Sequence, residues 1–166
     1  VCTRFHTMDQ VLHKMMKESD NLYAESMYYQ IAASTGNRPA SAKSARNVER
    51  QLIRKIGLNP SKYKLADGSG LSLYNYLSAE LETMMLRYAF RNDNIKEHLI
   101  HALPIAGVDG TLKKRMGTLT GIISLAGYCK AANGHDLCFS IINNGIMHGN
   151  NARNFADKVC TLLCQP

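Results

Sequence analysis

The segment GTLTGIISLAGYCKAANGHDLCFSIINN, residues 117–144, decides the fold of this chain. Asn133-Gly134 lies between two apolar runs rich in β-branched residues, and this dipeptide suits a hairpin turn with positive φ at its central residues. Both runs are nearly continuous in apolar residues instead of alternating with polar ones, so both faces of the strands are expected to be covered. The segment therefore predicts an antiparallel hairpin at the centre of a sheet, with helices packed on it.

Helices are predicted before and after this hairpin. Apolar residues recur there at helical spacing, and Gly36 and Gly57 stand where two of the helices would end. The order of elements favours an α+β fold, an antiparallel sheet with packed helices, in a single domain spanning residues 1–166. The expected helices are residues 8–18, 22–33, 42–56, 78–91, 94–101 and 151–163; short strands are expected over residues 1–7 and 63–66, and a glycine-containing turn over 67–72.

The composition is that of an ordinary soluble domain, with 45% hydrophobic and 20% charged residues in a chain of 166. No apolar run approaches the length of a bilayer span, so no transmembrane segment is expected. The net charge of +7 comes from basic residues that are spread along the chain without interleaved aromatic residues. A solvated surface therefore explains the charge better than a nucleic-acid partner, and attraction to an acidic polymer or substrate stays open as an alternative.

Neither a metal nor a cofactor is expected. The five cysteines form no C-x-x-C pair and no zinc-binding spacing. His98 and His101 can share a helix face, but no third ligand is spaced to join them. Small-residue turns such as Gly68-Ser69-Gly70 cradle phosphate only between a strand and a helix that follows directly.

The cysteines of the hairpin raise the question of a disulfide. Counting outward from a two-residue turn at Asn133-Gly134 places Cys129 opposite Cys138, at a non-hydrogen-bonded position where Cα atoms come closest. A cross-strand disulfide is sterically feasible there in an oxidising compartment, and two small buried thiols are the alternative. Cys160 and Cys164 are one helical turn apart and belong to one helix face.

Three further stretches together resemble one protein family. They are Ser19-Asp20-Asn21, the turn Asp67-Gly68-Ser69-Gly70-Leu71-Ser72, and residues 103–112 (LPIAGVDGTL) leading to Gly117-Thr118-Leu119-Thr120. In this order and spacing they resemble the D-alanyl-D-alanine carboxypeptidases of the low-molecular-mass, class C penicillin-binding proteins. The resemblance covers nearly the whole chain, and it implies part of the β-lactamase-like transpeptidase fold of penicillin-binding proteins.

The resemblance also implies a chemistry and a set of site residues. The family cleaves the bond between two D-Ala residues of peptidoglycan stem peptides through a serine acyl-enzyme, using S-x-x-K, S-D-N and K-T-G motifs. By resemblance Ser19 would pass a proton near the leaving nitrogen, and Asn21 would bind the substrate's amide. Gly117 and Thr118 match the end of the K-T-G-T motif, with the Thr118 N–H as an oxyanion donor, and Leu71 would contact substrate. Position by position, Ser19-Asp20-Asn21 also suits a plain cap between two helices.

Three departures separate this sequence from the family pattern. No S-x-x-K precedes Ser19, and Ser61-Lys62-Tyr63-Lys64 follows it in a proline-led connector, where the match is a coincidence. Arg115-Met116 stand before Gly117 in place of Lys-Thr, and Leu73 stands where many relatives have Arg. We therefore expect the C-terminal part of the catalytic domain of a longer enzyme, with the nucleophile on an N-terminal part of the same protein.

Two classes of function follow. The first is a serine-type D-Ala-D-Ala carboxypeptidase or endopeptidase that acts on peptidoglycan peptides, in the periplasm or otherwise outside the cytoplasm, and is acylated by β-lactams. The second is a non-catalytic relative that binds peptidoglycan or supports a partner domain. A nucleophile-bearing segment upstream and a Lys-Thr before Gly117 in the parent gene would discriminate the first class from the second.

Overall fold

A computed structural model describes residues 5–36, 38–106, 108, 118–119 and 122–164 of the chain. The described helices and strands follow the order expected from the sequence, with helical ends that differ by one or two residues from the predicted ones. They are α1 (Met8–Lys17), α2 (Asn21–Ala33), α3 (Ala42–Lys55), a 3-10 turn (Pro60–Lys62), α4 (Ala79–Phe90), α5 (Asp93–Ala102), β1 (Thr118–Leu119), β2 (Ile122–Lys130), β3 (Asp136–Asn144) and α6 (Gly149–Cys164).

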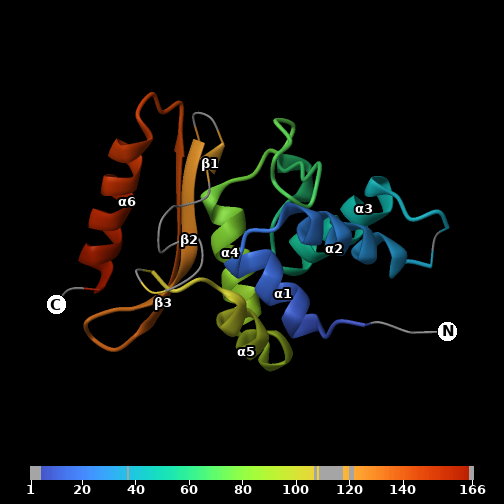
Figure 1. The fold of residues 1–166 in the computed structure, drawn as a ribbon, viewed down its shortest axis with the longest axis horizontal. Coiled ribbons are helices and arrows are strands. Elements are labelled where there is room, and N and C mark those ends of the chain that lie inside the picture. Colours follow the sequence, from blue (N-terminus) through green and yellow to red (C-terminus); the bar gives the residue numbers. More distant parts are fainter. Residues whose placement is uncertain (1–4, 37, 107, 109–117, 120–121, 165–166) are drawn as a thin grey trace.

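The predicted α+β architecture is confirmed. The described strands form one antiparallel sheet in the order β1-β2-β3. Figure 1 shows α6 along one face of this sheet and α4 along the other, with α1, α2, α3 and α5 beyond α4. The two covered faces explain why the strands are apolar on both sides. Ile123 of β2 is 3% exposed and packs with Ala152 and Ala156 of α6.

The hairpin is present, but its predicted register is wrong by one residue. Cys129 pairs with Leu137, and Tyr128 pairs with Cys138. The Gly134 N–H donates to the Ala131 carbonyl at 2.9 Å, and Gly134 has a φ of 83°. This combination makes a three-residue loop with a glycine bulge in place of a two-residue turn, and the extra residue moves every pair by one. Cys129 and Cys138 therefore lie on opposite faces of the sheet, and no disulfide can join them.

The first arm of the hairpin predicted over residues 117–144 forms two strands, β1 and β2. Thr118 pairs with Ile123 and Leu119 with Ile122, so the chain reverses between β1 and β2. The strand expected over residues 63–66 is reduced to a single bridge between Lys64 and Tyr76. Of the edge strand expected at residues 1–7, the described part, residues 5–7, is not in a strand.

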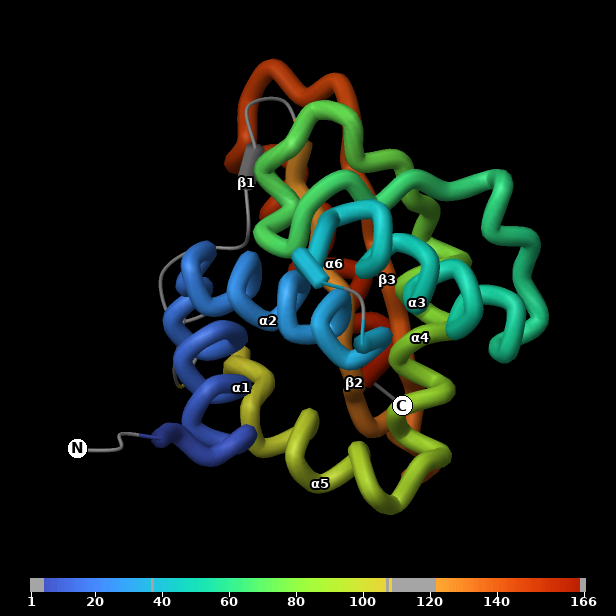
Figure 2. The backbone as a smooth tube through the Cα atoms, turned by 90° about the vertical axis from the view of Figure 1, so that its right-hand side faces the viewer, coloured from blue at the N-terminus to red at the C-terminus, as the bar shows by residue number. Residues whose placement is uncertain are grey.

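The helices beyond α4 form two packed pairs, α1 with α5 and α2 with α3, which Figure 2 shows side by side. The α2–α3 pair closes around Tyr28, Ala32 and Ala45, which are 3%, 0% and 0% exposed. The hydroxyl of Tyr28 donates to the carbonyl oxygens of Ala42 and Leu65, both at 3.3 Å, so it ties α2 to α3 and to the segment that follows. This segment leads into the loop of residues 67–72.

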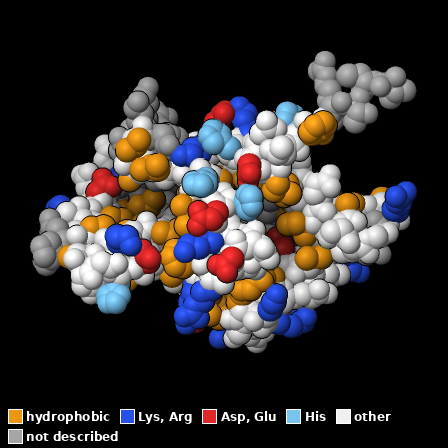
Figure 3. Space-filling model, turned by 90° about the horizontal axis from the view of Figure 1, so that it is seen from below, with side chains coloured by type: hydrophobic (Ala, Val, Ile, Leu, Met, Phe, Trp, Pro, Cys, Tyr) orange, Lys and Arg blue, Asp and Glu red, His pale blue; other side chains and the backbone are white. Residues whose placement is uncertain are grey.

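The surface bears charges of both signs. Figure 3 shows acidic and basic side chains intermixed on the lower face of the molecule. His98 of α5 pairs with Asp9 of α1, and Lys130 pairs with Asp136 across the hairpin at 2.8 Å. In the described part of the chain, every helix is too short or too polar to cross a bilayer.

Candidate active site

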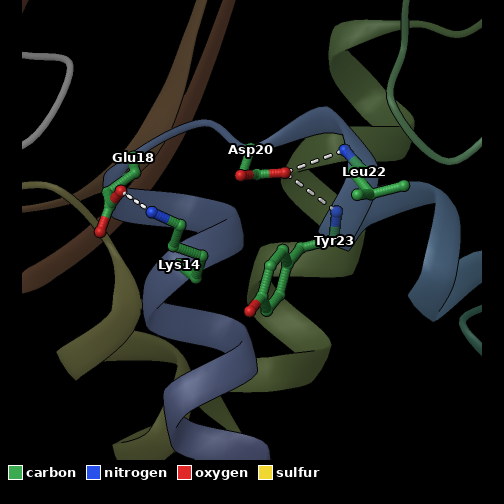
Figure 4. Close-up of polar contacts among 5 residues, drawn as sticks. All are labelled: Lys14, Glu18, Asp20, Leu22 and Tyr23. Carbon is green, nitrogen blue, oxygen red and sulfur yellow. Dashed lines mark hydrogen bonds and ion pairs between the residues drawn. The ribbon is translucent and has the colours of Figure 1, made fainter.

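The junction between α1 and α2 is built by Ser19-Asp20-Asn21. Asp20 is the N-cap of α2, and its Oδ1 accepts the N–H groups of Leu22 at 3.0 Å and Tyr23 at 3.1 Å (Figure 4). On the other side of the junction, Lys14 pairs with Glu18 in the last turn of α1. Of the three residues in this triplet, Asp20 therefore provides the expected helix cap. Both of its neighbours are exposed.

Ser19 is held in an uncommon backbone conformation. Its φ is 56°, and among the described residues it is the one non-glycine residue with a positive φ. A serine in the left-handed region costs free energy relative to glycine, and such residues concentrate where a side chain must be aimed. Ser19 lies at the sharp bend from α1 into α2 and is exposed.

The loop of residues 67–72 is held in shape by two carboxylates. Asp67 accepts the Gly70 N–H at 2.9 Å and the Ser72 N–H at 2.7 Å, one on each oxygen. Glu25 of α2 accepts both the N–H of Ser69, at 3.0 Å, and its hydroxyl, at 2.7 Å. Charge-assisted bonds of this kind fix the loop in one conformation and attach it to the helix that begins at Asn21.

Gly68 lets this loop approach α2 closely. A Cβ atom at position 68 would lie 2.5 Å from the carbonyl oxygen of Ala24 and 2.7 Å from Cβ of Tyr28. Both atoms belong to the helix itself and cannot rotate away. The absence of a side chain at this position is therefore a packing requirement, which places residues 69–72 beside Ser19 and Asn21.

These elements surround a cavity of about 550 Å³ between the helical half and the sheet. Its lining comes from five places that are far apart in the sequence. The α1–α2 junction gives Ser19 and Asn21, the loop gives residues 69–73 and 75–77, α4 gives Glu82, β2 gives Ile122 and Ser124, and β3 gives Ile142 and Asn144.

The structure brings three of the predicted site residues together, since Ser19, Asn21 and Leu71 line this cavity. Thr118 belongs to β1, next to the strand whose Ile122 and Ser124 line the cavity. Gly117 lies outside the described residues, as does most of the segment of residues 103–117. The functional roles of all five stay predictions.

Other residues of the cavity were missed from the sequence. Glu82 accepts the hydroxyl of Ser140 at 2.6 Å and so links α4 to β3 at the cavity edge. Ser124 and Asn144 line the wall formed by the sheet. Period-two alternation along β2 and β3 would have placed these residues on one face, but only the correct hairpin register shows which face meets α4.

The described lining can bind a polar, extended ligand. It offers serine hydroxyls, asparagine amides and one carboxylate beside the apolar side chains of Leu71, Leu73 and Tyr76, which are 53%, 88% and 71% exposed. The described residues contribute no cationic side chain to the lining. They also form no group of three or more His, Cys, Asp or Glu residues that could hold a metal ion. The S-x-x-K match at Ser61 and Lys64 lines other hollows, and Ser61 donates its hydroxyl to Asn59 at 2.8 Å.

A second hollow of about 410 Å³ lies behind the loop and contains a buried carboxyl group. One oxygen of Glu49 is buried without a hydrogen-bond partner among the described residues. Burial raises the pKa of Glu49 to about 7, and the nearby Arg46 counteracts this only in part. Burial, with the nearby Glu49, also raises the pKa of Tyr28, which lines the same hollow.

Comparison with known proteins assigns the chain to a family. Residues 4–165 match the D-Ala-D-Ala carboxypeptidase 3 (S13) family. The chain is 34% identical over 157 residues to D-alanyl-D-alanine carboxypeptidase DacB of Haemophilus influenzae, covering 86% of this chain and 33% of the relative. It is also 34% identical over 170 residues to carboxypeptidase DacB of Mycolicibacterium smegmatis, covering 92% of this chain and 36% of that relative.

Solved structures agree with this assignment. Penicillin-binding protein 4 (dacB) of Haemophilus influenzae superposes with a TM-score of 0.79 at 30% identity, over 90% of this chain and 39% of that structure. The peptidoglycan endopeptidase Bd3459 of Bdellovibrio bacteriovorus, at a TM-score of 0.68 and 16% identity, over 94% of this chain and 42% of that one, shares the fold. The chain therefore belongs to the D-Ala-D-Ala carboxypeptidase 3 (S13) family of serine peptidases. It spans about a third of the length of the curated relatives that it matches.

Proposed function

We propose that these 166 residues form one side of the active site of a serine-type D-Ala-D-Ala carboxypeptidase or endopeptidase that acts on peptidoglycan stem peptides. The observation that carries the proposal is the shared cavity. Ser19 and Asn21 from the helical half, Leu71 from the anchored loop, and the sheet wall of β2 and β3 all line it. A peptide bound there would touch both halves of the fold at once.

Each predicted residue has a role in acyl transfer. Ser19 relays a proton toward the leaving nitrogen, and Asn21 hydrogen-bonds an amide of the peptide. The N–H of Thr118 donates to the oxyanion, with Gly117 beside it giving the ligand close access to the backbone. Leu71 contacts the apolar part of the substrate. The anchoring of the loop by Asp67 and Glu25 supports this scheme, because a preorganised site loses little entropy on binding.

The attacking serine and its lysine lie on an N-terminal part of the same protein in this scheme. Acyl transfer needs a hydroxyl, a base for its proton and donors for the oxyanion. The described cavity lining offers no cationic side chain that could serve as the base, which supports an outside source. Arg115 is a poor substitute for the lysine of K-T-G, because a guanidinium stays protonated in proteins.

The ligands and the location follow from the family. We propose that the parent protein acts in the periplasm or otherwise outside the cytoplasm, where peptidoglycan is found, and that β-lactams acylate its nucleophile. The similarity to penicillin-binding protein 4 of Haemophilus influenzae, which has been solved in complex with a β-lactam, supports this part.

A labelling experiment tests the proposal. The 166-residue chain and the full-length protein of the parent gene are incubated with a fluorescent penicillin and with a D-Ala-D-Ala peptide. We expect the parent to form a covalent adduct and release D-Ala, and the 166-residue chain to do neither. An adduct on the chain alone would place the nucleophile within residues 1–166 and contradict the scheme. A parent that neither labels nor turns over would favour the non-catalytic, peptidoglycan-binding alternative.

A further inference from the structure

The hairpin register separates the two cysteines of the sheet. Cys138 lies on the face covered by α4, where its thiol approaches the carbonyl oxygen of Thr83 at 3.8 Å. Its pairing partner Tyr128 faces the same way and donates to the Leu86 carbonyl at 2.7 Å. Because side chains alternate along a strand, Cys129 lies on the opposite face, which α6 covers.

Two cysteines of α6 lie on, or at the edge of, the helix stripe that faces this side of the sheet. Ala152 and Ala156 are 5% and 0% exposed and pack on Ile123 of β2. Cys160 follows four residues after Ala156 and is half-buried, so it continues this stripe. Cys164 follows one turn later and is exposed, and at ~100° per residue it lies about 80° round the helix axis from Ala156, at the edge of the covered side. On the strand, Cys129 continues the row that begins with Ile123, since it lies an even number of residues away.

The lengths of the two elements place the last turn of α6, which carries Cys160 and Cys164, beside Cys129. The start of α6 is next to the start of β2, since a Cβ on Gly149 would lie 3.1 Å from Cδ1 of Ile123. From there α6 and β2 run side by side in the same direction (Figure 1). The six steps from Ile123 to Cys129 span about 20 Å at ~3.3 Å each, and the fifteen steps from Gly149 to Cys164 span about 22 Å at ~1.5 Å each.

The surroundings of the two thiols agree with this placement. Burial raises the pKa of the Cys129 thiol, and a hydrogen bond with Cys164 and the charge of that thiol act in the same direction. Cys160 contributes only through its charge. Cys164 is exposed at the end of α6, whereas Cys129 and Cys160 are half-buried. The pair thus joins one thiol that a reagent can reach to one that is shielded by the helix.

We propose that Cys129 and Cys164 form a disulfide that fastens the end of α6 to the end of β2. In the cell this step relies on the location outside the cytoplasm that we propose for the parent protein, where a disulfide-bearing oxidant is present. The thiolate of Cys164 attacks the oxidant disulfide and releases one oxidant thiol. The thiolate of Cys129 then attacks the Cys164 sulfur and displaces the second. Two protein thiols lose two electrons and two protons, and the oxidant disulfide becomes two thiols.

Oxidation of the purified chain tests the pairing independently of the location and of any activity. The 166-residue chain is incubated with oxidised glutathione, blocked with a thiol reagent, and digested with trypsin without reduction. We expect a cross-linked pair of peptides, residues 116–130 and 159–166, with a mass about 2 Da below their sum, as loss of two hydrogens requires. The same sample is expected to melt about 5–10 °C higher than the reduced chain, because the bridge closes a loop of 36 residues.

Matched variants identify the partner, because one tryptic peptide carries both cysteines of α6. Cys164→Ser should abolish the cross-linked peptide and the rise in melting temperature. Cys160→Ser and Cys138→Ser should keep both, since Cys160 lies one turn earlier and Cys138 lies on the other face of the sheet. No cross-link in the wild-type chain, or a cross-link that survives Cys164→Ser and disappears in Cys160→Ser, would overturn the assignment.

Discussion

Gly68→Ala is expected to detach the loop of residues 67–72 from α2. The new Cβ would lie 2.5 Å from the Ala24 carbonyl oxygen, and no rotamer change can relieve this contact. The loop must move outward, which costs about 1–3 kcal/mol for the overpacking. The movement also weakens the bonds from Ser69 to Glu25, and a hydrogen bond to a charged group contributes about 1.5–3 kcal/mol. Because the two effects overlap, we expect a total loss of about 2–4 kcal/mol in the free energy of unfolding.

Urea unfolding of the 166-residue chain measures this loss, and Gly127→Ala is the matched control. Gly127 is also buried and has no atom within 4 Å of the position of an added Cβ. The control should therefore stay within about 0.5 kcal/mol of the wild type, apart from a small gain from the less flexible unfolded chain. If Gly68→Ala proved as stable as Gly127→Ala, the loop would not be docked on α2 as described, and the preorganisation of the cavity would lose its basis.

Three further changes test other parts of the account. Because the pKa of Glu49 is raised from 4.5 to about 7, its contribution to stability is full below pH 4.5 and is lost as the pH rises to 7. Across this pH range the free energy of unfolding of the wild type should fall by about 1–2 kcal/mol, a figure that allows for the partial exposure of Glu49. Glu49→Gln should not show this fall, whereas Glu97→Gln, a change at an exposed residue, should still show it. Asp20→Ala should lower stability by about 1 kcal/mol through loss of the α2 cap, and Asp20→Asn should retain most of it; equal losses would argue against capping. Ser19→Gly should be more stable than Ser19→Ala by about 0.5–1 kcal/mol because only glycine relieves the positive φ, and the reverse order would contradict the backbone conformation.

The sequence was sufficient for the elements whose signals are local. The Asn133-Gly134 turn, the apolar strands and the amphipathic helices depend on neighbours within a few residues, and all were predicted. The register failed because Asn-Gly is compatible with both a two-residue turn and a three-residue loop with a glycine bulge. The wrong register placed Cys129 on the same face of the sheet as Cys138 in the prediction, so its neighbour on α6 was not recognised.

The motif residues of the candidate site were predicted, but the contacts that hold them in place were not. Ser19, Asn21 and Leu71 came from family motifs that are short and contiguous. The contacts that hold them do not have such a pattern: Glu25 anchors Ser69 from 44 residues away, and Glu82 meets Ser140 from 58 residues away. The glycines of the loop indicated a turn, but only the packed structure shows that Gly68 is required by close contact with α2.

In the proposed scheme Ser19 takes part in acyl transfer in addition to lying beside a helix cap. The most direct measurement is the rate constant of acylation by a fluorescent penicillin in the full-length parent protein, for the wild type, Ser19→Ala and Ser34→Ala. Ser34 gives the same chemical change at the opposite end of α2, where its hydroxyl only donates to the Ile31 carbonyl. We expect Ser19→Ala, like Asn21→Ala, to slow acylation by roughly 10²–10⁴-fold, as loss of a general acid–base does, and Ser34→Ala to match the wild type. Acylation at the wild-type rate in Ser19→Ala would show that the serine only shapes the junction between two helices.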